Sequence, residues 1–137
     1  MEKWLIGVLV AGSIVFLVML QALSEKRRAL RHMRGRPSLT DVEFGRQFFT
    51  SDRQQIASRL RQILSRHIAV DVSQLHPGDK LVQDIRMDSL DSLSIVEFVF
   101  DVEREFGISI LNTAAEQMYT LQDVVEYVAS HLPKTTV

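Results

Sequence analysis

Two Asp-Ser-Leu triplets stand close together in the C-terminal half of the chain, and their serines are the first candidates for chemistry. They read Asp88-Ser89-Leu90 and Asp91-Ser92-Leu93, within the segment DIRMDSLDSLSIVEF of residues 84–98. A serine hydroxyl needs an activating base to act as a nucleophile, and no base stands at a neighbouring position that would suggest a triad. A serine at the start of a helix can also cap it by accepting a free backbone N–H. On their own, the triplets therefore predict helix caps rather than a catalytic serine.

Other side chains that commonly carry out chemistry in proteins are absent or dispersed. The 137 residues include no cysteine, which excludes disulfides, Cys-bound metals and an intrinsic thiol. The four histidines, at positions 32, 67, 76 and 131, have no partner at metal-ligand spacing, and the carboxylates at 84, 88, 91 and 97 do not fit an EF-hand loop. We expect no metal site and no enzymatic activity, and any thioester chemistry requires a thiol from elsewhere.

Periodic apolar residues predict the elements that position these serines. One helix, capped by Ser51 or Asp52, carries its apolar face at Ile56, Leu60, Ile63, Leu64 and Ile68. A long connection with a turn at 77–79 leads to a second helix, from about Ser89 or Ser92 to Phe106, which ends at Gly107. A third opens at the capping-box-like segment 120–123 and stops before Pro133. With a short piece near 112–118 and no sustained strand alternation, the pattern predicts an all-α bundle.

The N-terminal segment predicts a single transmembrane helix. Residues 4–23, WLIGVLVAGSIVFLVMLQAL, carry no charge, and a helix of this length extends about 30 Å, the thickness of a bilayer core. Before the apolar segment, the only basic residue is Lys3, which stands beside Glu2. Six basic residues follow the segment: Lys26, Arg27, Arg28, Arg31, Arg34 and Arg36. The positive-inside rule then predicts that the protein is anchored in the inner membrane with its C-terminal domain in the cytoplasm. The six basic side chains would then lie near anionic lipids. The basic run has no interleaved aromatic residues, so we expect no nucleic-acid partner.

The sequence divides into four parts. Residues 1–25 form the anchor, 26–52 a basic juxtamembrane segment and linker, 53–133 the bundle, and 134–137 a tail. Within the linker, Thr40 and Glu43 have capping-box spacing in a short amphipathic helix. We favour packing of this helix on the bundle over contact with lipid.

The stretch from Ile56 to Leu132 resembles an acyl carrier protein. The segment IASRLRQILSRHIAV is similar to the first helix of that family, LHPGDKLVQDI to its long loop, DSL to the head of its second helix, VEFVFDVEREFGISI to the body of that helix, and TLQDVVEYVASHL to the last helix. The resemblance implies that the DSL serine carries 4'-phosphopantetheine, which a phosphopantetheinyl transferase attaches from coenzyme A. Its thiol would hold acyl groups as thioesters, and so would supply the thiol that this chain lacks.

The sequence exceeds the family pattern by about one helical turn, which leaves two serines to choose between. Counting forward through the loop, Asp88-Ser89-Leu90-Asp91 looks like the family's DSLD. Counting backward from Phe106-Gly107, the usual helix length reaches Ser92, and Asp91-Ser92-Leu93 begins a segment that looks like DSLxxVE. We favour Ser92, with Ser89 as the alternative, because a buried helical face fixes register more tightly than a loop fixes its length. Asp91, Leu93 and Asp88 complete the expected attachment site.

The second helix predicts a surface for partner enzymes. On a helical wheel, Ser94, Glu97, Asp101 and Glu105 form a narrow stripe, while apolar residues cover most of the rest: Leu93, Val96, Val99, Phe100, Val102 and Phe106. Such an acidic stripe attracts basic surfaces. It looks like the face by which the family engages its enzymes, so we expect Glu97, Asp101 and Glu105 to bind acyl-transferring or acyl-modifying enzymes.

The expected function is that of a membrane-tethered acyl carrier, which delivers acyl groups to enzymes of fatty acid, lipid or related biosynthesis at the cytoplasmic membrane surface. It is a cosubstrate rather than a catalyst. The alternative is an unmodified adaptor that binds basic partners through its acidic helix, motivated by Arg86, where the family commonly has glycine, and by the shifted serine. A secreted bundle, cleaved after Ser24, is a third possibility.

Overall fold

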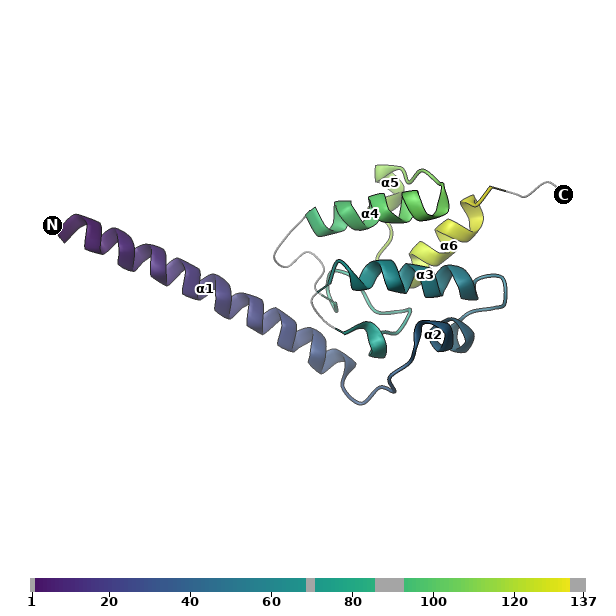
Figure 1. The fold of residues 1–137 in the computed structure, drawn as a ribbon, viewed down its shortest axis with the longest axis horizontal. Coiled ribbons are helices and arrows are strands. Elements are labelled where there is room, and N and C mark those ends of the chain that lie inside the picture. The colour runs from purple at the N-terminus through teal and green to yellow at the C-terminus, as the bar shows by residue number, and fades with distance from the viewer. Residues whose placement is uncertain (1, 69–70, 86–92, 134–137) are drawn as a thin grey trace.

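A helical bundle lies at the end of one long N-terminal helix (Figure 1). The computed structural model describes residues 2–68, 71–85 and 93–133. The helices are α1 (Glu2–Met33), α2 (Asp41–Phe48), α3 (Gln54–Ser65), the 3-10 turn η1 (Val72–Gln74), α4 (Leu93–Phe106), α5 (Asn112–Ala115) and α6 (Leu121–His131). In these described segments the sole β-type pairing is an isolated antiparallel bridge between Lys80 and Thr120. The predicted all-α class is confirmed.

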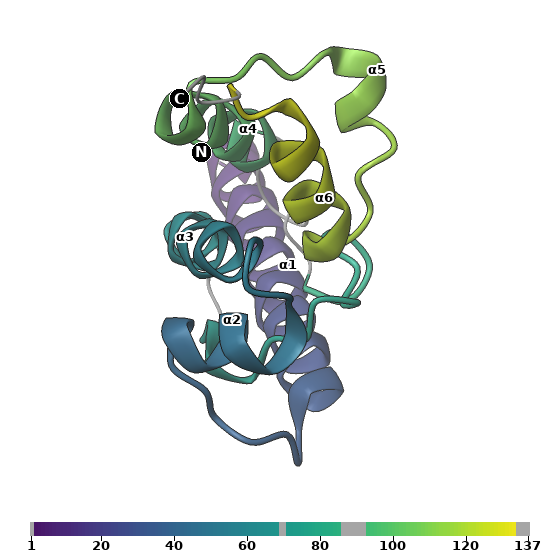
Figure 2. The ribbon, with the colours of Figure 1, turned by 90° about the vertical axis from the view of Figure 1, so that its right-hand side faces the viewer.

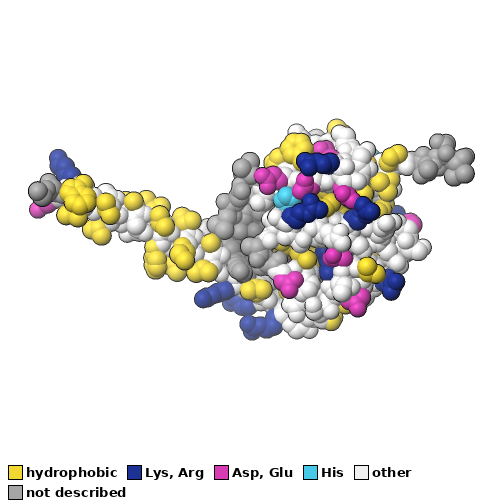
Figure 3. Space-filling view, viewed as in Figure 1, with side chains coloured by type: hydrophobic (Ala, Val, Ile, Leu, Met, Phe, Trp, Pro, Cys, Tyr) yellow, Lys and Arg dark blue, Asp and Glu magenta, His cyan; other side chains and the backbone are white. Residues whose placement is uncertain are grey.

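Helix α1 continues beyond the apolar segment and through the basic one. Its apolar part is exposed on all sides and forms the rod in Figure 3, and Lys and Arg side chains gather where the rod meets the domain. We predicted a basic juxtamembrane segment and linker over residues 26–52, and the first part of this range is helical as far as Met33. Residues 25–33 are almost all good helix formers, and Ala29 and Met33, one turn apart, are fully buried in the core.

Helix α3 is the central element of the domain. It contacts α2, α4 and α6, and lies between α2 and α4 in both Figure 1 and Figure 2. Its buried apolar face includes Ile56, Leu60, Ile63 and Leu64, as the periodicity predicts. The predicted cap at Ser51 or Asp52 is wrong: Arg53 is the N-cap residue, without a side-chain cap bond, and the Asp52 carboxylate accepts a hydrogen bond from Thr50 instead.

Helix α2 packs on the bundle, as favoured from the sequence. The capping box of Thr40 and Glu43 is present, and Phe44 is fully buried against Phe48 and Phe49. Gly45 permits the close approach of α3, because a Cβ atom at this position would lie 2.5 Å from the Gln54 carbonyl oxygen. The helix is therefore part of the core rather than a lipid-facing segment.

The loop and the two C-terminal helices close the core. Leu75, Leu81 and Ile85 of the loop are buried, so the described part of this connection is ordered, as its apolar residues predict. Helix α4 ends at Gly107, whose φ of 64° is the left-handed conformation expected of a glycine C-cap. Helix α6 begins at the predicted capping box of Thr120 and Asp123 and buries Val124, Val125 and Val128.

Candidate functional site

The serine segment connects the loop to α4. The candidate residues Asp88, Ser89, Asp91 and Ser92 lie outside the described residues, and Leu93 is described only as the first residue of α4. The described neighbours are Ile85, which is buried, and the first turns of α4. The predicted attachment site therefore adjoins, in sequence, the part of α4 that borders a cavity.

An apolar cavity of about 670 Å³ opens beside α4. The loop at 80–83 and the segment from Ile110 to Val124 form its other walls. The α4 side chains in its wall are Ile95, Phe98, Val99 and Val102. Ile95 stands three residues after Ser92, one helical turn along the chain. A cavity of this size and polarity suits a small apolar ligand or a hydrocarbon chain.

Two carboxylates of the acidic stripe of α4 have partners within the domain. Asp101 Oδ2 lies 2.8 Å from His67 Nε2, two residues after the end of α3, and Glu105 accepts a hydrogen bond from Arg59 of α3. Glu97 is 65% exposed and lies 3.9 Å from His67 Nδ1. Of the three predicted partner-binding carboxylates, Glu97 is the one that most fully faces solvent.

The outer face of α4 carries exposed apolar residues beside the acidic stripe. Val96 is 48% exposed and Phe100 is 57% exposed, so these two side chains lie outside the core. On the helix they lie between the solvent-facing Glu97 and Arg104 and the cavity-lining Val99. The helical wheel alone did not show where the buried arc ends, because apolar residues occupy most of the circumference.

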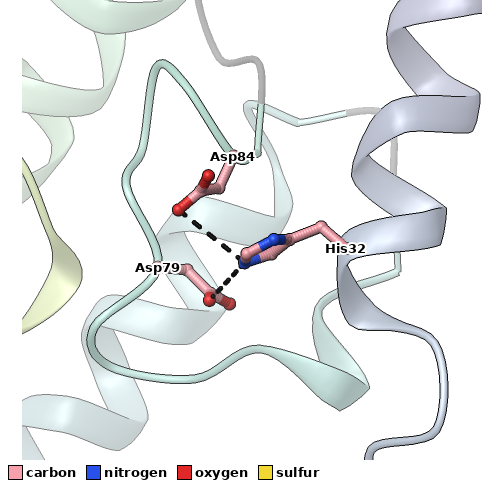
Figure 4. Close-up of side chains that lie close together, drawn as sticks. All are labelled: His32, Asp79 and Asp84. Atoms are coloured by element: carbon pink, nitrogen blue, oxygen red, sulfur yellow. Dashed lines mark hydrogen bonds and ion pairs between the residues drawn. The ribbon is translucent and has the colours of Figure 1, made fainter.

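A second cluster lies at the end of α1, and no motif in the sequence indicates it. His32, Asp79 and Asp84 point toward one another, with one potential ligand atom from each lying within 4.8 Å of the others (Figure 4). Three such groups could hold a metal ion, but Arg36 already donates hydrogen bonds of 2.6 and 2.9 Å to the two oxygens of Asp79. A guanidinium therefore balances the buried carboxylate. The expectation that Arg36 faces lipid headgroups is wrong, because this side chain turns toward the domain.

Hydrogen bonds determine the charge state of this cluster. Asp79 is only 3% exposed, and burial by itself would raise the pKa of its carboxyl. Hydrogen bonds from Arg36, from the His76 backbone N–H and from His32 outweigh burial and hold the pKa of Asp79 below its ordinary value. The same carboxylate raises the pKa of Arg36. The pair is therefore ionised at neutral pH.

Comparison with known proteins assigns the domain to a class. The family model described as "Phosphopantetheine attachment site" matches residues 58–128, which span α3 to α6. Together with the all-α bundle and the apolar cavity, this match defines a carrier domain.

Three relatives bear the name acyl carrier protein. The one from Cyanidioschyzon merolae is 38% identical over 78 residues, which cover 57% of this chain and 82% of the relative. Those from Thermotoga maritima and Rubrobacter xylanophilus are 35% and 32% identical over 82 and 80 residues, and the matches cover 98% and 95% of their lengths. The chain belongs to the acyl carrier protein family.

Membership settles the chemical role of the domain. The protein is a carrier and not an enzyme, and the family's covalent cofactor is 4'-phosphopantetheine, whose thiol holds the acyl group. Its partners include a phosphopantetheinyl transferase and acyl-handling enzymes. The apolar cavity fits an acyl chain carried in this way.

Proposed function

We propose that this protein is a membrane-tethered acyl carrier that delivers acyl groups to enzymes at the cytoplasmic surface of the inner membrane. The observation that carries the proposal is the exposure of the apolar part of α1, whose most apolar window is not buried in the domain at all. A core helix of a soluble protein would bury such a surface. Three aspects of the function follow: the orientation of the anchor, the attachment serine and the location of the acyl chain.

The basic end of α1 supports the cytoplasmic orientation. Arg27, Arg28 and Arg31 are exposed on α1 just after the apolar segment, and Arg34 is exposed in the turn that follows the helix. Basic residues flanking a span favour the cytoplasmic side and attract anionic lipids. With Lys26, whose side chain lies outside the description, these residues form the proposed lipid-binding set, from which Arg36 is excluded by its contact with Asp79.

The proposed attachment residue is Ser92, with Ser89 as the alternative, and Asp88, Asp91 and Leu93 form its surroundings. We further propose that the cavity beside α4 shelters the acyl chain, and that Glu97, with Asp101 and Glu105 beside it, meets basic surfaces of partner enzymes. Two of these carboxylates have partners within the domain, Arg59 and His67, which weakens the alternative of an unmodified adaptor that binds through charge alone.

Two measurements on protein from the native host test the proposal. Intact mass followed by fragmentation should find one 4'-phosphopantetheine, which Ser92→Ala should remove and Ser89→Ala should retain. The reverse result would move the attachment to Ser89. The same mass must include residues 1–24, and the protein must remain in membranes washed with high salt. Loss of residues 1–24, or release by salt, would refute the tether and favour the secreted or soluble alternatives.

A further inference from the structure

The C-terminal end of α1 is built into the carrier domain. Ala29 and Met33 are fully buried and belong to the same apolar core as α3, α4 and α6. Residues 24–33 continue the helix from the end of the apolar segment, and Ala29, six residues after Leu23, lies about 9 Å beyond that end at about 1.5 Å per residue. An α-helix of this length is stiff, so no flexible linker intervenes between the proposed membrane span and the point of attachment.

A contact between charged and polar side chains, here called the juxtamembrane clasp, stabilises the attachment of α1 to the carrier domain. It consists of His32 and Arg36 on the α1 side and Asp79 on the loop side (Figure 4 shows His32 and Asp79). Arg36 makes a two-pronged contact with the carboxylate of Asp79, and His32 Nε2 lies 3.0 Å from its Oδ1 atom. A bidentate guanidinium–carboxylate contact fixes the relative orientation of the two groups as well as the distance between them. The clasp therefore resists rotation of the domain about α1.

Backbone groups on both sides reinforce the clasp. The Gln74 side chain donates to the Arg36 carbonyl oxygen at 2.7 Å, and the Leu39 N–H donates to the Ser73 carbonyl oxygen at 2.8 Å. The His76 N–H donates to Asp79 at 2.9 Å, which fixes the carboxylate within its own loop. The chain after α1 is thus bonded to residues 73–79 along its length.

The attachment also sets which side of the domain faces the membrane. In Figure 1, α4 begins on the side of the domain toward which α1 extends and ends on the opposite side. The cavity-lining residue Ile95 belongs to the first turn of α4, whereas Arg104 and Glu105 belong to the last. With α1 in a bilayer, the start of α4 is the end nearer the lipid.

We propose that the juxtamembrane clasp is a fixed joint that holds the carrier domain in one orientation, with the start of α4 toward the bilayer. The partners of a carrier domain held in this way are enzymes whose acyl-handling sites open at the headgroup layer of the same membrane. The inference rests on the proposed membrane tether. A flexible tether would let the domain reach enzymes free in the cytosol, whereas a fixed joint restricts the carrier to partners at one height above the bilayer.

Fluorophores at the two ends of α4 test the orientation. Because the chain has no cysteine, Val96→Cys and Arg104→Cys each give a single labelling site on the solvent-facing side of α4. The full chain is reconstituted in vesicles with spin-labelled headgroups, which quench a nearby fluorophore. We expect at least twofold stronger quenching at position 96 than at position 104. Equal quenching, or stronger quenching at 104, would overturn the proposal.

Variants of the clasp test whether the clasp causes the orientation of the carrier domain. Asp79→Asn and Arg36→Gln should each bring the quenching at the two positions to within about 20% of each other, with unchanged helical content by circular dichroism. Glu126→Gln, which removes the exposed pair with Arg53, is the matched control and should keep the difference. A difference that survives both clasp variants would overturn the role of the clasp. Co-sedimentation with vesicles is scored separately: a chain that does not sediment refutes the tether, whereas one that sediments without orientation refutes only the joint.

Discussion

Progressively longer acyl chains on the carrier should raise its free energy of unfolding until the cavity beside α4 is full. Unfolding exposes the whole acyl chain to water, whereas in the folded state the proposed cavity of about 670 Å³ would shelter it in apolar surroundings. Each buried methylene contributes about 0.8 kcal/mol, so two further carbons contribute about 1.6 kcal/mol before the cost of ordering the chain. In a domain of this size 1 kcal/mol shifts Tm by roughly 4–8 °C.

Thermal unfolding of the full chain in lipid nanodiscs measures the effect. Butyryl, hexanoyl and octanoyl forms should melt at successively higher temperatures than the unloaded form. Val99→Phe fills part of the cavity and should reduce or abolish these increments. Val96→Phe makes the same change on the exposed face of α4 and is the matched control, with increments like those of the unsubstituted chain.

Two results would refute this reasoning. One is a melting temperature that does not change with chain length in the unsubstituted protein. The other is an equal increment in Val99→Phe and Val96→Phe. Each variant is compared with its own unloaded form, because the additional ring at position 99 costs about 1–3 kcal/mol by overpacking alone.

Three further predictions concern single side chains. The folded state holds the pKa of Asp79 below its ordinary value, so the ionised carboxylate stabilises the domain at neutral pH. This contribution is lost only as the pH falls below about 4. When the free energy of unfolding is measured at decreasing pH, Asp79→Asn should therefore lose less stability than the unsubstituted chain. Gly45→Ala should lower the free energy of unfolding in urea by about 1–3 kcal/mol, because its Cβ would meet backbone, whereas Gly78→Ala, whose Cβ would meet only a histidine ring, should change it less. Arg59→Ala should change it by less than about 1 kcal/mol, because its pair with Glu105 is exposed to solvent, and a larger loss would indicate that the pair has a packing role.

Features that depend on neighbouring residues could be read from the sequence. The uncharged run at 4–23, the capping boxes at Thr40 and Thr120, and the end of α4 at Gly107 all follow from interactions within about four residues. The family resemblance of residues 56–132 likewise depends on local motifs in the correct order, and the comparisons confirm it. The sequence by itself thus determined the helical class, the carrier domain and the candidate span. The choice between Ser92 and Ser89 stays a prediction.

Features that depend on distant residues required the tertiary structure. Arg36 and Asp79 are 43 positions apart, and nothing local indicates that a basic residue beside a membrane span meets a buried carboxylate. In the same way, His67 and Arg59 meet Asp101 and Glu105 only because α3 and the residues just after it pack beside α4. Packing decides which carboxylates remain free and how the domain is held against α1, because both depend on which surfaces meet after the helices have formed.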